Sequence, residues 1–257
     1  VVNIDDARGP ALAAECPTVV SYGLSPLAAV HPGPVAPSLA GLAFDAFTPA
    51  GRIAIRSRLA GRFNLYNLLA AVATGVALGV PGDAIAGGLA ALRAVPGRLQ
   101  IVSEPDDDIV VIVDYAHTDD ALANVLEAVR PLAAGRLVAV FGCGGDRDRK
   151  KRPLMGAVAA RLADAVIVTS DNPRSEDPER ILDDIERGVP GAAAPRWTRQ
   201  ADRREAIDSA ILGAAPSDVV VVAGKGHERY QIIGDRVLPF DDVDVAQAAL
   251  ARRRLAG

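Results

Sequence analysis

Short apolar runs alternate with longer amphipathic segments through the second half of the chain. Four runs have the length and composition of buried strands, and they occupy 109–113, 137–141, 165–169 and 219–223. Between positions 118 and 132, apolar residues recur every three or four positions, which places them on one face of a helix. Strands that alternate with helices are typical of a parallel sheet covered on both faces. This half is therefore predicted to be a Rossmann-like α/β domain with a mostly parallel sheet.

Capping and turn residues mark the ends of several of these elements. Thr118 can cap the helix that follows the first strand, and Asp202 with Glu205 three residues later forms a capping-box pattern. Near the end of the chain, Gly234 and Asp235 separate two strand-like segments, 230–233 and 236–240. A two-residue connection of this kind predicts a β-hairpin.

A different pattern governs the first half. The expected elements are a strand at 1–4, a helix after Asp5 and Asp6, an apolar run at 18–22, and a hairpin of 42–47 and 52–59 around Thr48-Pro49-Ala50-Gly51. Helices rich in leucine and alanine should follow over 64–78 and, after a glycine-proline break, to about 94. We place a domain boundary at Val95-Pro96-Gly97, so that 1–95 and 96–257 form separate domains.

The composition limits the classes of partner. A formal net charge of −4 gives no general attraction for nucleic acid or acidic lipid. No apolar stretch reaches the roughly 20 residues that span a bilayer. Cys16 and Cys143 lie far apart in sequence and match no metal-ligand spacing. The simplest interpretation is that the protein works in a reducing compartment, where both remain free thiols. We expect a cytoplasmic monomer that inserts into no membrane, binds no nucleic acid and carries no metal-ligand set of its own.

In an open parallel sheet, ligands bind beyond the carboxyl ends of the strands, so the loops there are the candidates for chemistry. The first is Asp114-Tyr115-Ala116-His117-Thr118, with an acid and an imidazole where strand meets helix. Asp114 can accept hydrogen bonds from ribose hydroxyls, and His117 can face a phosphate or a metal-bound oxygen. The alternative is that Asp114 caps the turn and His117 lies on the surface.

The second loop is glycine-rich and then densely charged, with the sequence Gly142-Cys143-Gly144-Gly145-Asp146-Arg147-Asp148-Arg149-Lys150-Lys151-Arg152. Glycines permit close approach of the backbone to an anion, and arginines offer two donors to a carboxylate or phosphate. The alternative is a flexible loop with a solvated run of charges. Its position directly after a buried strand favours a function.

The third and fourth loops are short. Asp171-Asn172-Pro173-Arg174 precedes Ser175-Glu176-Asp177-Pro178, whose last proline fits the first position of a helix. Asp-Asn-Pro is also an ordinary turn sequence, and turn chemistry alone favours a structural role. Gly224-Lys225-Gly226-His227-Glu228 lacks the spacing of a Walker A loop. Its alternative is a glycine turn with an exposed lysine and glutamate.

Taken together and in this order, these loops resemble the Mur ligase family, and within it the members that add meso-diaminopimelate. The likeness covers nearly the whole chain, and the ordered set of motifs is far more specific than any one of them. Its residues are Gly61-Arg62-Phe63-Asn64-Leu65-Tyr66-Asn67, Pro96-Gly97-Arg98, 114–118, 141–148 with 151–156, 171–174 and 223–228. The resemblance implies the end of a central ATPase-type domain at 1–95 and a Rossmann-like C-terminal ligase domain at 96–257.

The resemblance also implies an activity, that of an ATP-dependent, Mg²⁺-requiring ligase of peptidoglycan synthesis. Such an enzyme phosphorylates a carboxylate of UDP-N-acetylmuramoyl-L-alanyl-D-glutamate. An amino group of meso-diaminopimelate then attacks the acyl phosphate and forms an amide. Phosphorylation supplies the leaving group, while the protein contributes positioning and charge neutralisation.

By the same resemblance, two sets of residues bind the substrates. The ATP contacts are Asn64 and Asn67 for adenine, Arg98 for phosphate, and Asp114 and His117. The meso-diaminopimelate contacts are Arg147, Asp171, Asn172, Pro173, Arg174, Gly224 and Glu228. A guanidinium such as Arg174 can pair with the second carboxylate of diaminopimelate, which lysine lacks. Glu228 can balance an acceptor ammonium.

Some features depart from the family. Asp119 stands where proline is usual, at an expected helix start where an acid is favourable. The chain lacks a phosphate-cradling P-loop, a UDP-sugar module and the segment of the family's carbamylated lysine, so no catalytic residue is assigned. Because it opens on a strand-like Val1-Val2-Asn3-Ile4 and its only methionine is Met155, we expect a fragment that is inactive alone.

Two rival interpretations stay open. One is a lysine-adding or other Mur-type amide ligase, against which the Asp171 to Arg174 loop argues. The other is a non-catalytic domain that binds an amino acid or a nucleotide.

Overall fold

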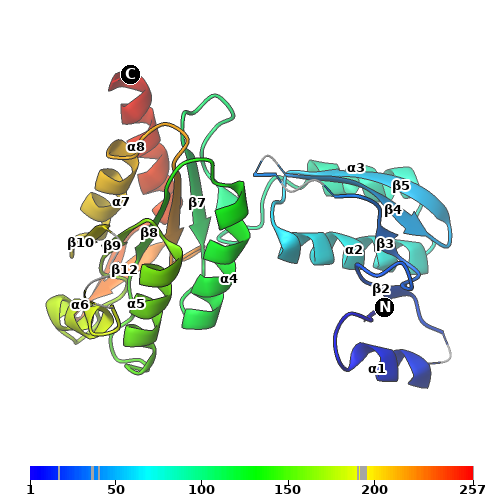
Figure 1. Cartoon of the computed structure of the whole chain (residues 1–257), viewed down its shortest axis with the longest axis horizontal. Coiled ribbons are helices and arrows are strands. Elements are labelled where there is room, and N and C mark those ends of the chain that lie inside the picture. The colour runs from blue at the N-terminus through cyan, green and yellow to red at the C-terminus, as the bar shows by residue number, and fades with distance from the viewer. Residues whose placement is uncertain (17, 36–37, 40, 190, 192–195, 257) are drawn as a thin grey trace. The chain divides into compact units, whose positions relative to one another are not determined.

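A computed structural model describes residues 1–16, 18–35, 38–39, 41–189, 191 and 196–256. The chain forms two compact units, Val1–Val95 and Pro96–Gly257 (Figure 1). Within the described residues, no helix has both the length and the apolar character that a membrane span requires. Cys16 and Cys143 are both free thiols.

The first unit is built on the predicted hairpin. Strand β4 (Leu42–Thr48) pairs antiparallel with β5 (Gly51–Ser57), and the short β3 (His31–Pro32) pairs with β4. Alternate residues of the hairpin are buried against helix α2 (Arg62–Ala77), while α3 (Gly82–Ala91) contacts β5. Before them, β1 (Val2–Asn3), α1 (Gly9–Glu15) and β2 (Ser21–Tyr22) form a small parallel unit. The hairpin and both helices confirm the sequence pattern.

A six-stranded sheet forms the centre of the second unit, in the order β10-β9-β8-β11-β7-β6. Neighbours from β10 to β7 are parallel, and only β6 at the edge is antiparallel. The strands are β6 (Gln100–Ile101), β7 (Val110–Asp114), β8 (Leu137–Phe141), β9 (Ala165–Val168), β10 (Arg196–Arg199) and β11 (Val219–Ala223). The four strands expected from apolar runs are confirmed.

Helices cover both faces of this sheet. On one face, α7 and α8 pack together over Val111, Val113, Val220 and Val222. Because side chains alternate across a strand, the intervening residues face the other side; there α4 contacts α5, and α5 contacts α6 (Figure 1). The helices are α4 (Asp119–Val129) with the 3₁₀ turn η1 (Arg130–Leu132), α5 (Lys151–Leu162), α6 (Pro178–Glu186), α7 (Arg203–Leu212) and α8 (Asp242–Ala256).

The expected caps are present, with one difference. Thr118 accepts a hydrogen bond from the backbone of Ala121, so Asp119 begins α4 as expected. Asp202 likewise accepts from Glu205 N at 3.1 Å. The return bond of a capping box is absent, because Asp202 N donates instead to Gln200 Oε1 and the Glu205 carboxylate accepts from Gln200 Nε2. Gln200 thus completes this helix start in place of the predicted reciprocal pair.

Strand β10 was missed because its sequence, Arg196-Trp197-Thr198-Arg199, has no apolar pattern. It lies at the sheet edge, where three of its four residues are exposed and backbone pairing with β9 suffices. The predicted C-terminal hairpin is confirmed as β12 (Tyr230–Ile233) and β13 (Arg236–Pro239), turning at Gly234 and Asp235.

A fully buried ion pair joins the helix layer to the strand ends. Arg203 of α7 meets Asp242 of α8 at two points, with Nε 2.8 Å from Oδ1 and Nη2 2.7 Å from Oδ2. The same guanidinium donates to the carbonyl oxygens of Ser170, two residues beyond the end of β9, and of Ala223, the last residue of β11. It therefore fixes the points from which two of the candidate loops depart.

Candidate functional site

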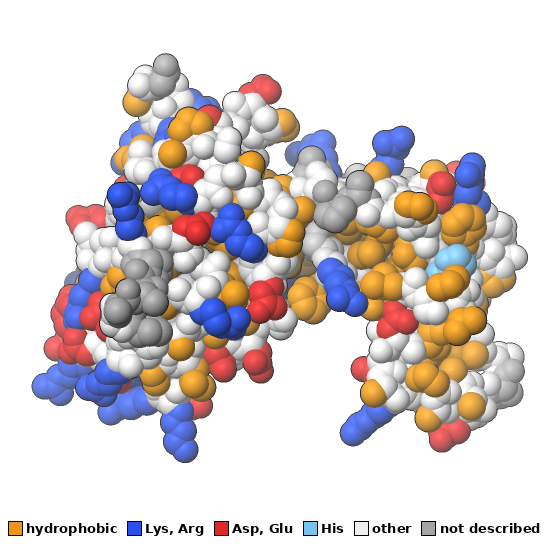
Figure 2. Space-filling view, viewed as in Figure 1, with side chains coloured by type: hydrophobic (Ala, Val, Ile, Leu, Met, Phe, Trp, Pro, Cys, Tyr) orange, Lys and Arg blue, Asp and Glu red, His pale blue; other side chains and the backbone are white. Residues whose placement is uncertain are grey.

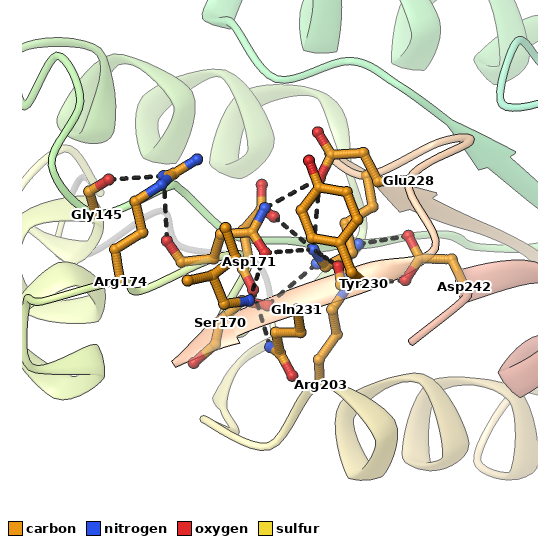
Figure 3. Close-up of polar contacts among 12 residues, drawn as sticks. Gly145, Ser170, Asp171, Arg174, Arg203, Glu228, Tyr230, Gln231 and Asp242 are labelled. Atoms are coloured by element: carbon orange, nitrogen blue, oxygen red, sulfur yellow. Dashed lines mark hydrogen bonds and ion pairs between the residues drawn. The ribbon is translucent and has the colours of Figure 1, made fainter. Parts of the chain in front are cut away.

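The four candidate loops share one edge of the sheet because they follow four adjacent parallel strands. In sheet order, these strands are β9, β8, β11 and β7. The side chains of the loops gather in two groups. One surrounds Asp171 and Arg174 (Figure 3), and the other surrounds Tyr115.

The glycine-rich loop packs directly on the third loop. Gly145 N donates to Asn172 O at 2.8 Å, and Arg174 Nη1 donates to Gly145 O at 2.7 Å. A methyl group added at Gly145 would lie 1.9 Å from the carbonyl oxygen of Pro173, and one at Gly142 would lie 2.1 Å from that of Thr169. These two glycines therefore permit one loop to approach the other, and the close approach of an anion to this loop stays a prediction.

Arg152, the last residue of the charged run, is fully buried. Its Nη1 lies 3.0 Å from Glu176 Oε2 and 2.9 Å from Asp184 Oδ2, and its Nη2 donates to Glu176 Oε1 and Gly144 O. The hydrogen bond from Arg152, together with a backbone bond from Asp146, lowers the pKa of Glu176 to about 2. For Arg152, the alternative of a solvated charge is wrong. The side chain instead holds the second loop to the third.

Two residues of these loops have left-handed backbone without being glycine, Asp146 (φ 52°) and Arg174 (φ 53°). Such a conformation costs about 1 kcal/mol or more and persists only where other contacts enforce it. Asp146 accepts hydrogen bonds from both the backbone and the hydroxyl of Ser175, and Arg174 N donates to Ile232 O. The two loops hold each other in this strained form.

The guanidinium of Arg174 has unused donors. Its Nη1 donates to Gly145 O and, at 3.4 Å, to Asn172 O, as Figure 3 shows for Gly145. Its Nε and Nη2 have no hydrogen-bond partner in the described part of the chain. Arg174 is half-buried, so solvent reaches its side chain.

Arg147 lies beside Arg174. A methyl group added at Gly144 would be 3.0 Å from Arg174 Nη1 and 3.6 Å from Arg147 Cγ, so both arginines flank this glycine. Arg147, Arg149 and Lys150 are exposed. Figure 2 shows Lys and Arg side chains gathered over the α5 and α6 end of the second unit. The two arginines that flank Gly144, Arg147 and Arg174, suit a carboxylate ligand.

Asp171, Asn172 and Glu228 converge on a residue that the sequence left unassigned, Lys225. Its side chain is 0% exposed, so the alternative of an exposed lysine is wrong. Lys225 Nζ lies 2.9 Å from Asn172 Oδ1, 2.8 Å from Tyr230 O, 3.2 Å from Asp171 Oδ1 and 3.6 Å from Glu228 Oε2. Burial lowers the pKa of Lys225, an effect that Asp171 and Glu228 oppose.

Gly224 is required where it stands. Its backbone is left-handed (φ 119°), and an added methyl group would lie 3.3 Å from Asp171 Oδ2. Together with Gly226 (φ 56°), it turns the chain so that Lys225 points inward. Two glycines around a lysine after a buried strand are the signal that could have revealed this burial.

The second group begins with Asp114, which is buried at the end of β7. Its carboxylate accepts from Leu99 N at 2.7 Å and from Ala116 N at 2.8 Å, so it fixes two stretches of backbone. Burial raises its pKa, and these backbone bonds oppose the rise. The side chain therefore caps the turn, and any contact with a ribose would use its remaining lone pairs.

Around Asp114 lies a set of flat or charged side chains centred on Tyr115. The rings of His117 and His227 lie 4.6 and 5.0 Å from the Tyr115 ring, and the Arg98 guanidinium lies 5.2 Å from it. Arg98, His117 and His227 are exposed. Such a set can stack on a base or face a phosphate. The sequence had singled out Arg98 and His117 but not His227.

The remaining candidates belong to the first unit, at the start of α2. Asn64 is buried and donates to Ala60 O, while the exposed Asn67 donates to Asn64 Oδ1 at 3.3 Å. Between them, Tyr66 donates to Asp5 at 2.8 Å. Across the described ranges of both units, no three histidine, cysteine or acidic side chains group as metal ligands.

Two family models match the chain. The model described as Mur ligase, glutamate ligase domain matches residues 97–226, and the Mur ligase middle domain matches 1–75. Together with the solved structures below, these matches confirm the expected fold class.

Curated relatives and solved structures agree. The chain is 52% identical to the UDP-N-acetylmuramoyl-L-alanyl-D-glutamate–2,6-diaminopimelate ligase of Gloeobacter violaceus, over 100% of this chain and 52% of that protein. A solved structure of a ligase of the same name matches with a TM-score of 0.73 and 40% identity, over 98% of this chain and 53% of that one. Folylpolyglutamate synthase of Mycobacterium tuberculosis shares the fold, with a TM-score of 0.61 and 20% identity over 93% and 50%. The chain spans about half the length of the curated relatives it matches.

Glu176→Gln should lower the free energy of unfolding at neutral pH by about 3 kcal/mol, because Arg152 would lose a buried charge partner. The folded-state pKa of Glu176 is about 2, below its ordinary value of 4.5. The carboxylate therefore stabilises the fold fully above about pH 4.5 and progressively less as the pH falls toward about 2. Urea unfolding of both proteins should show their difference shrinking in that window. A difference that does not change with pH would contradict this account.

Proposed function

The chain belongs to the Mur ligase family, and on that basis we propose that it forms the acceptor-binding part of a ligase that adds meso-diaminopimelate to UDP-N-acetylmuramoyl-L-alanyl-D-glutamate. Residues 1–95 would be the remainder of the central ATP-binding domain, and 96–257 the C-terminal ligase domain. The whole protein would act as a cytoplasmic monomer in peptidoglycan synthesis.

The observation that carries this proposal is the charge arrangement of the acceptor group. Arg174 has free guanidinium donors beside Arg147, which suits a carboxylate. Nearby, Asp171 and Glu228 share the single ammonium of Lys225, which leaves one negative charge in excess. A carboxylate and an ammonium on one carbon, as at each end of diaminopimelate, match these two features.

This pairing explains a preference for diaminopimelate over lysine. The far end of lysine carries an ammonium and no carboxylate, so Arg174 and Arg147 would face no partner. A site built to pair with a charged group rejects an analogue that lacks the group. With the far end held, the other amino group is positioned for attack on the activated carboxylate, and such positioning can supply much of the rate acceleration.

The residues assigned to ATP have suitable chemistry. His117 offers a ring face and Arg98 a guanidinium, and the rings of Tyr115 and His227, which the sequence did not assign to ATP, lie close to them. Asn64 and Asn67 place amide groups at the start of α2. When bound, ATP would supply the phosphoryl group that turns the dipeptide carboxylate into an acyl phosphate, a mixed anhydride from which phosphate leaves when the amine attacks. Mg²⁺ usually keeps waters and phosphate oxygens as ligands, and the described residues contain no group of three histidine, cysteine or acidic side chains that could hold it.

Calorimetry on this chain tests the acceptor assignment. We expect tighter binding of meso-diaminopimelate than of L-lysine. Arg174→Ala should weaken diaminopimelate by about 10- to 100-fold, since a charge-assisted pair is lost, with little change for lysine or ATP. Arg180→Ala, an exposed arginine on the neighbouring α6, is the matched control. Equal binding of lysine and diaminopimelate to the wild type would contradict the proposal that this site selects meso-diaminopimelate as the acceptor.

A chimera tests whether the chain supports catalysis, which a non-catalytic binding domain would not. This chain would replace the matching half of the Gloeobacter violaceus ligase, to which it is 52% identical. We expect diaminopimelate-dependent release of ADP and formation of the amide product. A folded chimera that binds diaminopimelate but releases no ADP would favour the binding domain.

A further inference from the structure

Lys225 is the one lysine of the chain's three whose side chain is fully buried. An ammonium removed from water without partners would cost several kcal/mol. The atoms around the Lys225 ammonium must therefore act as its hydrogen-bond and ion-pair partners. All four atoms around Nζ are oxygens that can only accept, so the nitrogen must donate, a role for which the ammonium has three N–H groups.

The ammonium fixes the orientation of the Asn172 amide. Asn172 Oδ1 accepts from Lys225 Nζ at 2.9 Å and from Ile232 N at 3.0 Å. Both neighbours are donors, so the atom between them has to be the amide oxygen. The amide nitrogen then points the opposite way, and it donates to Glu228 Oε2 at 3.0 Å.

The position of Glu228 follows from this chain of bonds. Its Oε2 faces both Asn172 Nδ2 and, at 3.6 Å, the ammonium. Its Oε1 has no hydrogen bond or ion pair with any residue that the structure describes. The carboxylate is thus held by one oxygen and offers the other. Figure 3 shows Glu228 beside Tyr230, at the margin of the group that contains Asp171.

Lys225, unlike Glu228, leaves no part of its charged group open to a ligand. Its ammonium is surrounded by protein oxygens and 0% exposed, so it has no open face for a ligand. A contribution to acceptor binding has to pass through the groups that it holds. This distinguishes it from Arg174, which has free donors.

We propose that Lys225 is a positioning residue for the acceptor. Through Asn172, it orients Glu228 so that the free carboxylate oxygen meets the ammonium adjoining the second carboxylate of diaminopimelate. This inference rests on the proposed function and deepens it, because it names what makes the site select a second amino group. Arg174 would select the second carboxylate.

The test compares two ligands on the 257-residue chain by calorimetry. One is meso-diaminopimelate, and the other is L-2-aminopimelate, which keeps both carboxylates but lacks the second amino group. Lys225→Met should weaken diaminopimelate by about 10- to 100-fold, as expected for loss of a charged hydrogen bond, and should change aminopimelate binding far less. Lys150→Met, an exposed lysine of another loop, should change neither.

A second variant covers the case in which Lys225→Met does not fold. Asn172→Asp keeps an oxygen for Lys225 and Ile232 but replaces the donor to Glu228 with a second oxygen. It should displace Glu228 and give the same selective loss of diaminopimelate. Equal weakening of both ligands in the folded variants would overturn the proposal.

The binding results distinguish failure of the proposed function from failure of the positioning role of Lys225. A wild-type chain that binds neither ligand contradicts the proposed function itself. A wild-type chain that binds both ligands equally well keeps the carboxylate assignment but overturns the role given to Glu228 and Lys225. Preference for diaminopimelate in the wild type, lost in the variants, supports both.

Discussion

The candidate acceptor site depends on the buried ammonium of Lys225. A charge so far from water is tolerated only while its oxygen partners stay in place. Those partners belong to three segments: Asp171 and Asn172 after β9, Glu228 after β11, and the backbone of Tyr230 in β12. The segments therefore cannot move independently, and loops that would otherwise be mobile form one preorganised unit. Preorganisation of this kind is what binding sites need in order to be selective.

A second buried cation extends the same principle to the glycine-rich loop. Arg152 pairs with Glu176 and Asp184 and also holds Gly144 O, so the loops after β8 and β9 are fixed to each other. Arg203 fixes the strand ends beneath them. Three interior cations thus use up the carboxylates and carbonyls around them. Arg174 and Glu228 keep unused donors and acceptors at half-buried positions that solvent reaches.

Sequence periodicity predicted the strands and helices well because they are buried in regular patterns. The parallel order of β9, β8, β11 and β7 then brought four separate loops to one edge, as expected from strand ends alone. The state of individual charged residues could not be predicted in this way. The sequence left open whether Lys225 is exposed and whether Arg152 belongs to a solvated run of charges, because their partners lie far away in sequence; Lys225 and Asn172 are 53 positions apart. Strand β10 was missed for the opposite reason, since an edge strand needs no apolar pattern.

A crystal structure of the chain with meso-diaminopimelate would test the central claim most directly. One carboxylate of the ligand should pair with Nε and Nη2 of Arg174, and the adjoining ammonium should contact the free oxygen of Glu228. Lys225 should keep its contact with Asn172 at about the present 2.9 Å and should not touch the ligand. A ligand bound away from Arg174, or one that draws the Lys225 ammonium out of its oxygen partners, would contradict the account.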